Sequence, residues 1–226
     1  MRRAGRTWSS GRTCFSDVGP WVPGARRFES VAKISVIAVT TLVLVKHALP
    51  AFDMSRPPRE WQLSAEGELQ SQQLAGRLRA FLPLRLVTST EPKASSTGRL
   101  IAAELGLRAT VVDGVQELDR PAAPWQSKAG RERENAEIFG DPTRRVVGAE
   151  SGRDALDRFS AAIRAELDQT GEQNLVVITH GTVISLFVAA HNPLSAFDLW
   201  RDLECCSFVV VDGRSFSVRE IVRSDG

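Results

Sequence analysis

The 226-residue sequence contains little of what several protein classes require. It has three cysteines, of which Cys205 and Cys206 are adjacent and Cys14 is distant from both. This spacing is not the pattern of a disulfide framework. This cysteine usage favours a reducing compartment, so we expect a cytoplasmic protein. It also has only three histidines, and none is spaced with cysteine as zinc ligands are. We therefore expect neither a metal nor a cofactor.

No apolar run in the sequence reaches the roughly 20 residues that a membrane-spanning helix needs. The long run at residues 34–45 has 12 residues and lies between Lys33 and Lys46. We interpret it as the first core strand with its lead-in, and we expect no membrane partner. Anchoring to a membrane through this run is the weakest alternative, because it would remove the strand from the core.

The charge of the chain is unevenly distributed. Residues 1–33 hold seven basic and two acidic residues, a net charge of +5, and residues 34–226 hold 22 basic and 25 acidic residues, a net charge of −3. A mildly acidic folded part argues against a nucleic-acid partner. We predict a disordered basic extension at 1–33, with organelle targeting as an alternative role, and a folded domain at 34–226. Monomer and homodimer both remain open.

Apolar patterns alternate between strands and helices along the predicted domain. After the first run, we expect strands at residues 84–88, 111–112, 174–179, 206–211 and 217–222. We expect helices at residues 64–81, 94–105, 131–139, 151–168 and 182–190. Strands joined by crossover helices predict an α/β fold, a three-layer α/β/α sandwich with a mostly parallel central sheet.

The first predicted helix has a recognisable beginning. Ser64 is a good N-cap, although Gly67 stands where a capping box would favour Glu. One face of this helix is predicted to carry Leu69, Leu74, Leu78 and Phe81.

Two of the expected strands end in histidine. The first apolar run leads into Lys46-His47, and the strand at 174–179 leads into His180-Gly181. The carboxyl ends of parallel strands lie at one edge of a sheet, where ligands bind. The strands at 84–88 and 111–112 would bring Lys93 and Glu117 to the same edge.

Two imidazoles, two ammonium groups and a carboxylate suit phosphoryl transfer from a monoester. A neutral imidazole can attack phosphorus and form a phosphohistidine, which divides one difficult displacement into two steps. Cations can hold the phosphoryl oxygens as charge spreads over them. A carboxylic acid can protonate the leaving alkoxide and then act as the base for water.

The order of these motifs resembles the histidine phosphatase superfamily, in its phosphoglycerate mutase-like branch. Lys46-His47-Ala48 stands in place of the family's Arg-His-Gly, and residues 63–67 match its Leu-(Ser/Thr)-x-x-Gly element. Residues 89–94 match a Ser-x-x-x-Arg-(Ala/Thr) loop with Lys93 for Arg. Further matches are Glu117 near a Leu-x-Glu stretch, a partial Gly-Glu-Ser at residues 148–151, and His180-Gly181 as the second His-Gly. The resemblance covers about residues 40–190.

The resemblance implies a role for each matched residue. His47 would be the phosphorylated nucleophile, and His180 would stabilise the transferring phosphoryl group. Lys46 and Lys93 would bind its oxygens. Glu117 would be the general acid, and the backbone N–H of Thr182 could add a phosphate contact at a helix N-terminus. The implied function is metal-independent hydrolysis of a small phosphorylated substrate.

Departures from the family pattern leave other functions open. Lysine is a point charge where arginine offers a planar fork to phosphate, and Ala48 adds a methyl group beside the nucleophile. A catalytically weak phospho-ligand-binding or regulatory module on the same fold is therefore one alternative, and a phosphoglycerate-type mutase is another. Glu91 and Glu150 are alternatives to Glu117 as the proton donor.

Overall fold

The computed structural model describes residues 40–120 and 127–224. Its strands are β1 (Thr41–Lys46), β2 (Leu84–Thr88), β3 (Ala109–Val111), β4 (Asn174–Thr179), β5 (Phe208–Asp212) and β6 (Val218–Val222). Its α-helices are α1 (Ala65–Leu78), α2 (Pro92–Leu105), α3 (Lys128–Gly140), α4 (Gly152–Thr170), α5 (Gly181–His191) and α6 (Ala196–Asp202). Short 3-10 helices are η1 (Pro58–Glu60) and η2 (Arg79–Phe81). The extension predicted at residues 1–33 lies outside the described residues.

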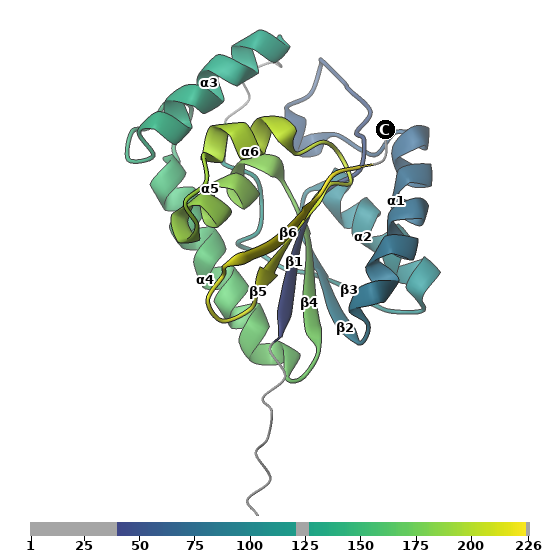
Figure 1. Cartoon of the computed structure of the whole chain (residues 1–226). Coiled ribbons are helices and arrows are strands. Elements are labelled where there is room, and N and C mark those ends of the chain that lie inside the picture. The colour runs from purple at the N-terminus through teal and green to yellow at the C-terminus, as the bar shows by residue number, and fades with distance from the viewer. Residues whose placement is uncertain (1–39, 121–126, 225–226) are drawn as a thin grey trace, which may run out of the picture. The chain divides into compact units, whose positions relative to one another are not determined.

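The strands form one sheet in the order β3-β2-β4-β1-β5-β6 (Figure 1). Neighbours are parallel from β3 to β1, whereas β5 runs antiparallel to both β1 and β6. The predicted α/β sandwich with a mostly parallel sheet is confirmed. Lys46 pairs with Thr179, so β1 and β4 end at the same level in the middle of the sheet.

Helices cover both faces of the sheet. Figure 1 shows α1 and α2 on one side and α4 and α5 on the other. Successive side chains of β1 alternate between these layers, because strand side chains point to opposite faces. Leu42 and Leu44 pack with α4 and α5, and Val43 and Val45 pack with α1 and α2. The first apolar run thus contributes a strand that is buried on both faces.

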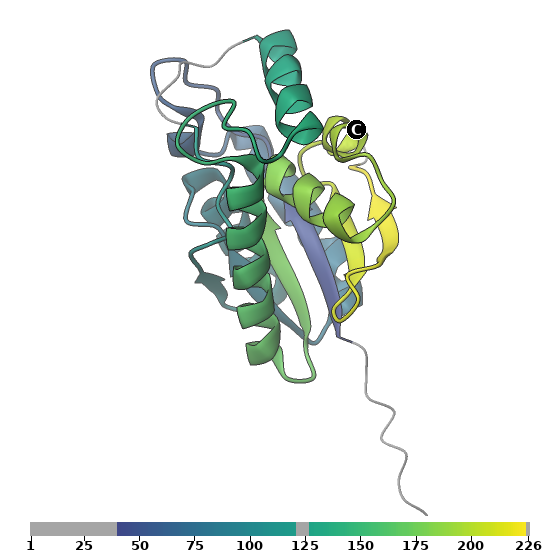
Figure 2. The same cartoon turned by 90° about the vertical axis from the view of Figure 1, so that its left-hand side faces the viewer.

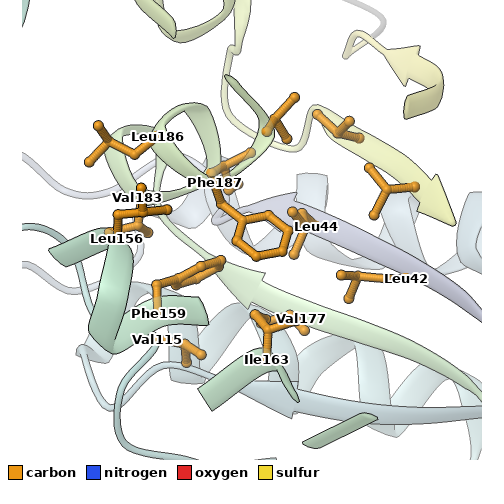
Figure 3. Close-up of a cluster of buried hydrophobic side chains, with 14 of the residues drawn as sticks. Leu42, Leu44, Val115, Leu156, Phe159, Ile163, Val177, Val183, Leu186 and Phe187 are labelled. Atoms are coloured by element: carbon orange, nitrogen blue, oxygen red, sulfur yellow. The ribbon is translucent and has the colours of Figure 1, made fainter. Parts of the chain in front are cut away.

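The layer formed by α4 and α5 has an aromatic centre (Figure 3). The rings of Phe159 and Phe187 meet edge to face with centroids 5.5 Å apart, over Leu44 and Val177 of the sheet. Burying each of these side chains contributes about 1.5–3 kcal/mol to the stability of the fold. This packing fixes α5, which begins directly after His180.

The predicted inner face of the first helix was partly wrong. Leu74 and Leu78 are buried, but Leu69 is 61% exposed. Leu74 lies five positions after Leu69, which places the two side chains about 140° apart around a helix. The inner face instead continues toward the N-terminus through Ser71 and Gly67.

The N-terminus of α1 lies against the backbone that follows His47. Ser64 Oγ accepts the Gly67 N–H at 3.0 Å, as expected of an N-cap. A Cβ atom on Gly67 would lie 2.2 Å from the carbonyl oxygen of Leu49. The capping-box glutamate is therefore absent because this position has no room for a side chain.

Several helices differ from the sequence expectation in their bounds, and one was not expected. α2 begins at Pro92, so Lys93 lies in its first turn and not in a loop. α3 extends beyond the predicted 131–139, and α6 was not predicted, because seven residues are too few to show a helical period. Figure 1 and Figure 2 show α3 and α6 beyond the carboxyl ends of the central strands. Within the described ranges, no helix combines the length and apolar character needed to cross a membrane.

Candidate active site

A cavity of about 680 Å³ lies at the carboxyl ends of β1 and β4. The ends of both strands, the first turn of α2, α3 and the segments around residues 50–61 and 116–120 contribute to its wall. All six residues predicted for the site line it, namely Lys46, His47, Lys93, Glu117, His180 and Thr182. Strands and loops distant in sequence thus converge on one cavity.

His47 follows β1 directly, and one of its ring nitrogens is held by the backbone of the next residue. Nδ1 lies 2.8 Å from the carbonyl oxygen of Ala48. A carbonyl only accepts, so Nδ1 carries the proton, and Nε2 has a lone pair when the ring is neutral. Burial lowers the pKa of His47 well below its usual value of 6.5, and the nearby His180 and Lys93 act in the same direction. The ring is therefore neutral at neutral pH.

His180 is fully buried at the N-cap position of α5. Its ring meets that of His47 edge to face, with centroids 5.2 Å apart. Nε2 lies 2.9 Å from Ser89 Oγ and 3.5 Å from Glu91 Oε1. Burial, and then Lys93, lowers the pKa of His180 well below 6.5. Two neutral imidazoles therefore stand side by side in the cavity.

Both lysines of the cavity donate to acceptors of the protein. Lys46 Nζ donates to the Leu203 carbonyl at 2.6 Å. Lys93 Nζ donates to the Pro58 carbonyl at 2.8 Å and forms a buried ion pair with Glu91. An ammonium group has three N–H donors, so these contacts leave each lysine capacity for a phosphoryl oxygen.

The additional methyl group of Ala48 points into the core. Ala48 is fully buried in the cluster that contains Val43 and Val45, and it is not part of the cavity wall. Its backbone N–H donates to Thr97 Oγ1 at 3.1 Å. The methyl group beside His47 therefore packs in the core and does not line the cavity.

The carboxylate of Glu117 is held at the N-terminus of α5. Oε2 accepts the Thr182 N–H at 3.2 Å, and Oε1 accepts the Leu118 N–H at 2.9 Å. The Thr182 N–H, which was predicted to contact phosphate, thus donates to the predicted general acid in this structure.

Arg158 fixes the segment that carries Glu117. Its guanidinium donates to the carbonyl oxygens of Gly114 at 2.9 Å and Glu117 at 3.2 Å. It also pairs with Glu150 through Nε at 2.8 Å and Nη2 at 2.9 Å. Glu150, one alternative proton donor, is thus held by an arginine. Sequence reasoning missed Arg158, because no local motif links α4 to this segment.

Glu91 places a second carboxylate within the cavity wall. Its side chain is 10% exposed and is paired with Lys93. Oε1 accepts the backbone N–H of Glu117 at 2.9 Å. The sequence indicated Glu91 only as an alternative proton donor, whereas the structure connects it to Lys93, His180 and the Glu117 backbone. In the described ranges, no group of three or more histidine, cysteine, aspartate or glutamate residues could hold a metal ion.

The family model "Histidine phosphatase superfamily (branch 1)" matches residues 42–222. The chain therefore belongs to this superfamily, as its motif order suggested. Among curated proteins, no significant match to the sequence was found.

Solved structures share the fold at low sequence identity. A mycobacterial glucosyl-3-phosphoglycerate phosphatase is 19% identical with a TM-score of 0.65, over 83% of this chain and 100% of that chain. The α-ribazole phosphatase of Shigella flexneri is 18% identical with a TM-score of 0.60, over 82% and 96%. A phosphoserine phosphatase mutant of Entamoeba histolytica is 12% identical with a TM-score of 0.65, over 81% and 97%. The TM-scores show a shared fold.

Proposed function

We propose that this protein hydrolyses phosphomonoesters through a phosphohistidine formed on His47. The observation that carries the proposal is a neutral His47 whose Nδ1 is hydrogen-bonded to the carbonyl oxygen of Ala48. The cavity that contains this ring also contains two lysines and Glu117. Membership of the histidine phosphatase superfamily supports it, as do three fold neighbours that are named phosphatases.

In the first step, the Nε2 lone pair of His47 forms a bond to phosphorus while the ester P–O bond breaks. Lys46 and Lys93 bind the phosphoryl oxygens and offset the charge that spreads over them. His180 lies beside the His47 ring. In this position it contacts the phosphoryl group that is being transferred. Glu117, in its acid form, gives its proton to the leaving alkoxide, which departs as an alcohol.

In the second step, water attacks phosphorus and the N–P bond breaks. The Glu117 carboxylate takes a proton from this water, which returns Glu117 to its acid form. Inorganic phosphate leaves, and the electron pair of the N–P bond returns to Nε2 of His47. Each group thus ends the cycle in its starting state, and no co-reactant other than water is needed.

Trapping of the phosphoenzyme tests this proposal. We expect ³²P from a generic aryl phosphomonoester to appear on the protein in an acid-labile form. We expect His47→Gln to lose the label and at least about 10³-fold of kcat, because it removes the nucleophile. His191→Gln is the matched control, since His191 lies outside the cavity wall and packs on Phe187 and Phe216. The absence of ³²P label on the wild type, together with no hydrolysis of a broad phosphomonoester panel, would contradict the proposal.

A phospho-ligand-binding module is the second candidate, favoured by one observation. Both lysine ammonium groups already donate to protein acceptors, and Lys93 is paired with Glu91. Glu117→Gln separates the two functions, because a hydrolase needs the proton that Glu117 supplies. Turnover unaffected by Glu117→Gln would favour the binding module.

Transfer of phosphate to a second hydroxyl compound without phosphate release would favour a mutase.

A further inference from the structure

Glu91 brings a carboxylate into the part of the cavity where phosphate is expected to bind. Its side chain is only 10% exposed, and it lines the cavity together with the lysines and histidines of the site. The family motif matched by residues 89–94 leaves this position open, so the resemblance assigns Glu91 no role. A negative charge opposes the binding of a negatively charged group, so a carboxylate at this place calls for an explanation.

Glu91 takes one of the three hydrogen-bond donors of Lys93. Lys93 Nζ forms an ion pair with Glu91 Oε2 and donates to the Pro58 carbonyl at 2.8 Å. One N–H of this ammonium group is then left for a phosphoryl oxygen. Two acceptors on one tetrahedral ammonium group lie about 4–5 Å apart, so a phosphoryl oxygen bound to Lys93 has the Glu91 carboxylate as a close neighbour.

Two further contacts keep this carboxylate in place. Glu91 Oε1 accepts the backbone N–H of Glu117 at 2.9 Å and lies 3.5 Å from His180 Nε2. His180 contacts the phosphoryl group in the proposed mechanism, so both oxygens of Glu91 lie beside groups that would bind phosphate. Because the Glu117 N–H holds Oε1, the carboxylate remains close to the phosphoryl group when Lys93 binds a ligand.

The effect of this carboxylate depends on the charge of the ligand. Like charges repel in proportion to the product of the two charges, so Glu91 opposes a doubly charged phosphoryl group about twice as strongly as a singly charged one. The cavity contains other charged groups, among them Lys46, Glu117 and the Arg158–Glu150 ion pair. They are the same in the wild type and in a Glu91 variant, so a comparison of the two isolates the contribution of Glu91.

We infer that Glu91 is a specificity-determining residue that competes with the phosphoryl group for Lys93 and favours phosphoryl groups with one negative charge over those with two. This role rests on the proposed phosphatase function. The preferred form of the substrate is then a monoester whose phosphoryl group carries a proton. The same carboxylate weakens the binding of inorganic phosphate in its doubly charged form, which limits inhibition by the product.

Calorimetry with two ligands of similar shape tests this role. Benzylphosphonate has two negative charges at a pH above its second pKa, and benzylsulfonate has one. Glu91→Gln removes the charge of the side chain and keeps its size. The ratio of phosphonate affinity to sulfonate affinity should rise about 10-fold or more in this variant, because the second charge of the phosphonate no longer meets a carboxylate. An unchanged ratio would overturn the inference and leave the phosphatase proposal standing.

Two further variants separate the charge of Glu91 from its contacts. Glu60→Gln is the matched control and should leave the ratio within about 2-fold of the wild type, because Glu60 also lines the cavity but is exposed, where water screens its charge. Glu91→Ala also removes the acceptor for the Glu117 N–H, and it should raise the ratio as Glu91→Gln does. If Glu91 only fastened the segment around Glu117, both variants would weaken both ligands alike, and this result would overturn the inference.

Inhibition by the product gives a second measurement. Inorganic phosphate should inhibit hydrolysis of an aryl phosphate by Glu91→Gln at an about 10-fold lower concentration than in the wild type. Equal inhibition of the two proteins would contradict the role of Glu91. If the wild type shows no hydrolysis and no phosphoenzyme, the phosphatase proposal fails, and the affinity ratio from calorimetry decides the role of Glu91 alone. Absence of binding of both ligands to the wild type and to Glu91→Gln would overturn it.

Discussion

Two buried neutral histidines make the stability of the fold depend on pH. In the unfolded chain each ring has a pKa near 6.5, whereas the pKa values of His47 and His180 in the fold lie well below it. Above pH 6.5 both states hold neutral rings, so these residues add no pH dependence. As pH falls below 6.5, the unfolded chain binds protons first, and the free energy of unfolding decreases by up to about 1.4 kcal/mol per pH unit for each histidine.

Denaturant unfolding of the wild type and His180→Asn at pH 7.5 and 5.5 measures this effect. The variant should lose less stability than the wild type between the two pH values, because it has one fewer histidine to protonate. Equal losses would contradict the assignment of a depressed pKa to His180.

The residues of the site differ in how far the sequence could predict them. His47 and His180 were expected to lie together, because each follows a buried run and parallel strands end at one edge of a sheet. Arg158 was missed, because its partners are set by how segments distant in sequence pack. The assigned roles of the six predicted residues stay predictions until the variants are measured.

Among the elements, α1 offers a direct test of how the fold positions His47, the proposed nucleophile. A Cβ on Gly67 would meet the Leu49 carbonyl oxygen at 2.2 Å, two residues after His47, whereas a Cβ on Gly76 would have no neighbour within 4 Å. Gly67→Ala should destabilise the protein by about 1–3 kcal/mol, because backbone must move, and should lower kcat as the His47 loop shifts. Gly76→Ala should stabilise it by about 0.5–1 kcal/mol, because alanine favours a helix interior.

Denaturant unfolding and steady-state kinetics on both variants measure these effects. Equal stability changes for Gly67→Ala and Gly76→Ala would show that the close approach of α1 to Leu49 does not constrain the fold.

Elements were predictable where the local signal was strong. The strands at 84–88 and 174–179 were predicted with their observed bounds, because each is a short apolar run between polar residues. The wrong placement of Leu69 came from grouping it with Leu74, although five positions along a helix place two side chains about 140° apart.

At the scale of the whole molecule, binding of inorganic phosphate should stabilise the domain. A ligand that binds only the folded state adds about 2.7 kcal/mol to the free energy of unfolding at a hundred times its Kd. Denaturant unfolding in rising phosphate, with chloride at matched ionic strength as the control, measures this gain. Lys46→Met should reduce the gain, because it removes a charge from the cavity wall. Equal stabilisation by chloride would show that the effect is not binding to this site.

The sandwich and the superfamily could be predicted from the order of motifs, but the order of strands in the sheet is a result of the structure. β4 lies between β1 and β2, although more than 80 residues separate it from β2 along the chain. During synthesis, the edges of β1 and β2 that β4 will join therefore have no partner until residue 174 and its successors emerge. The candidate cavity cannot form before β4 is made, because β4 joins β1 to β2 and delivers His180. Its formation depends on contacts between segments distant in sequence, so folding should be slow for a domain of this size.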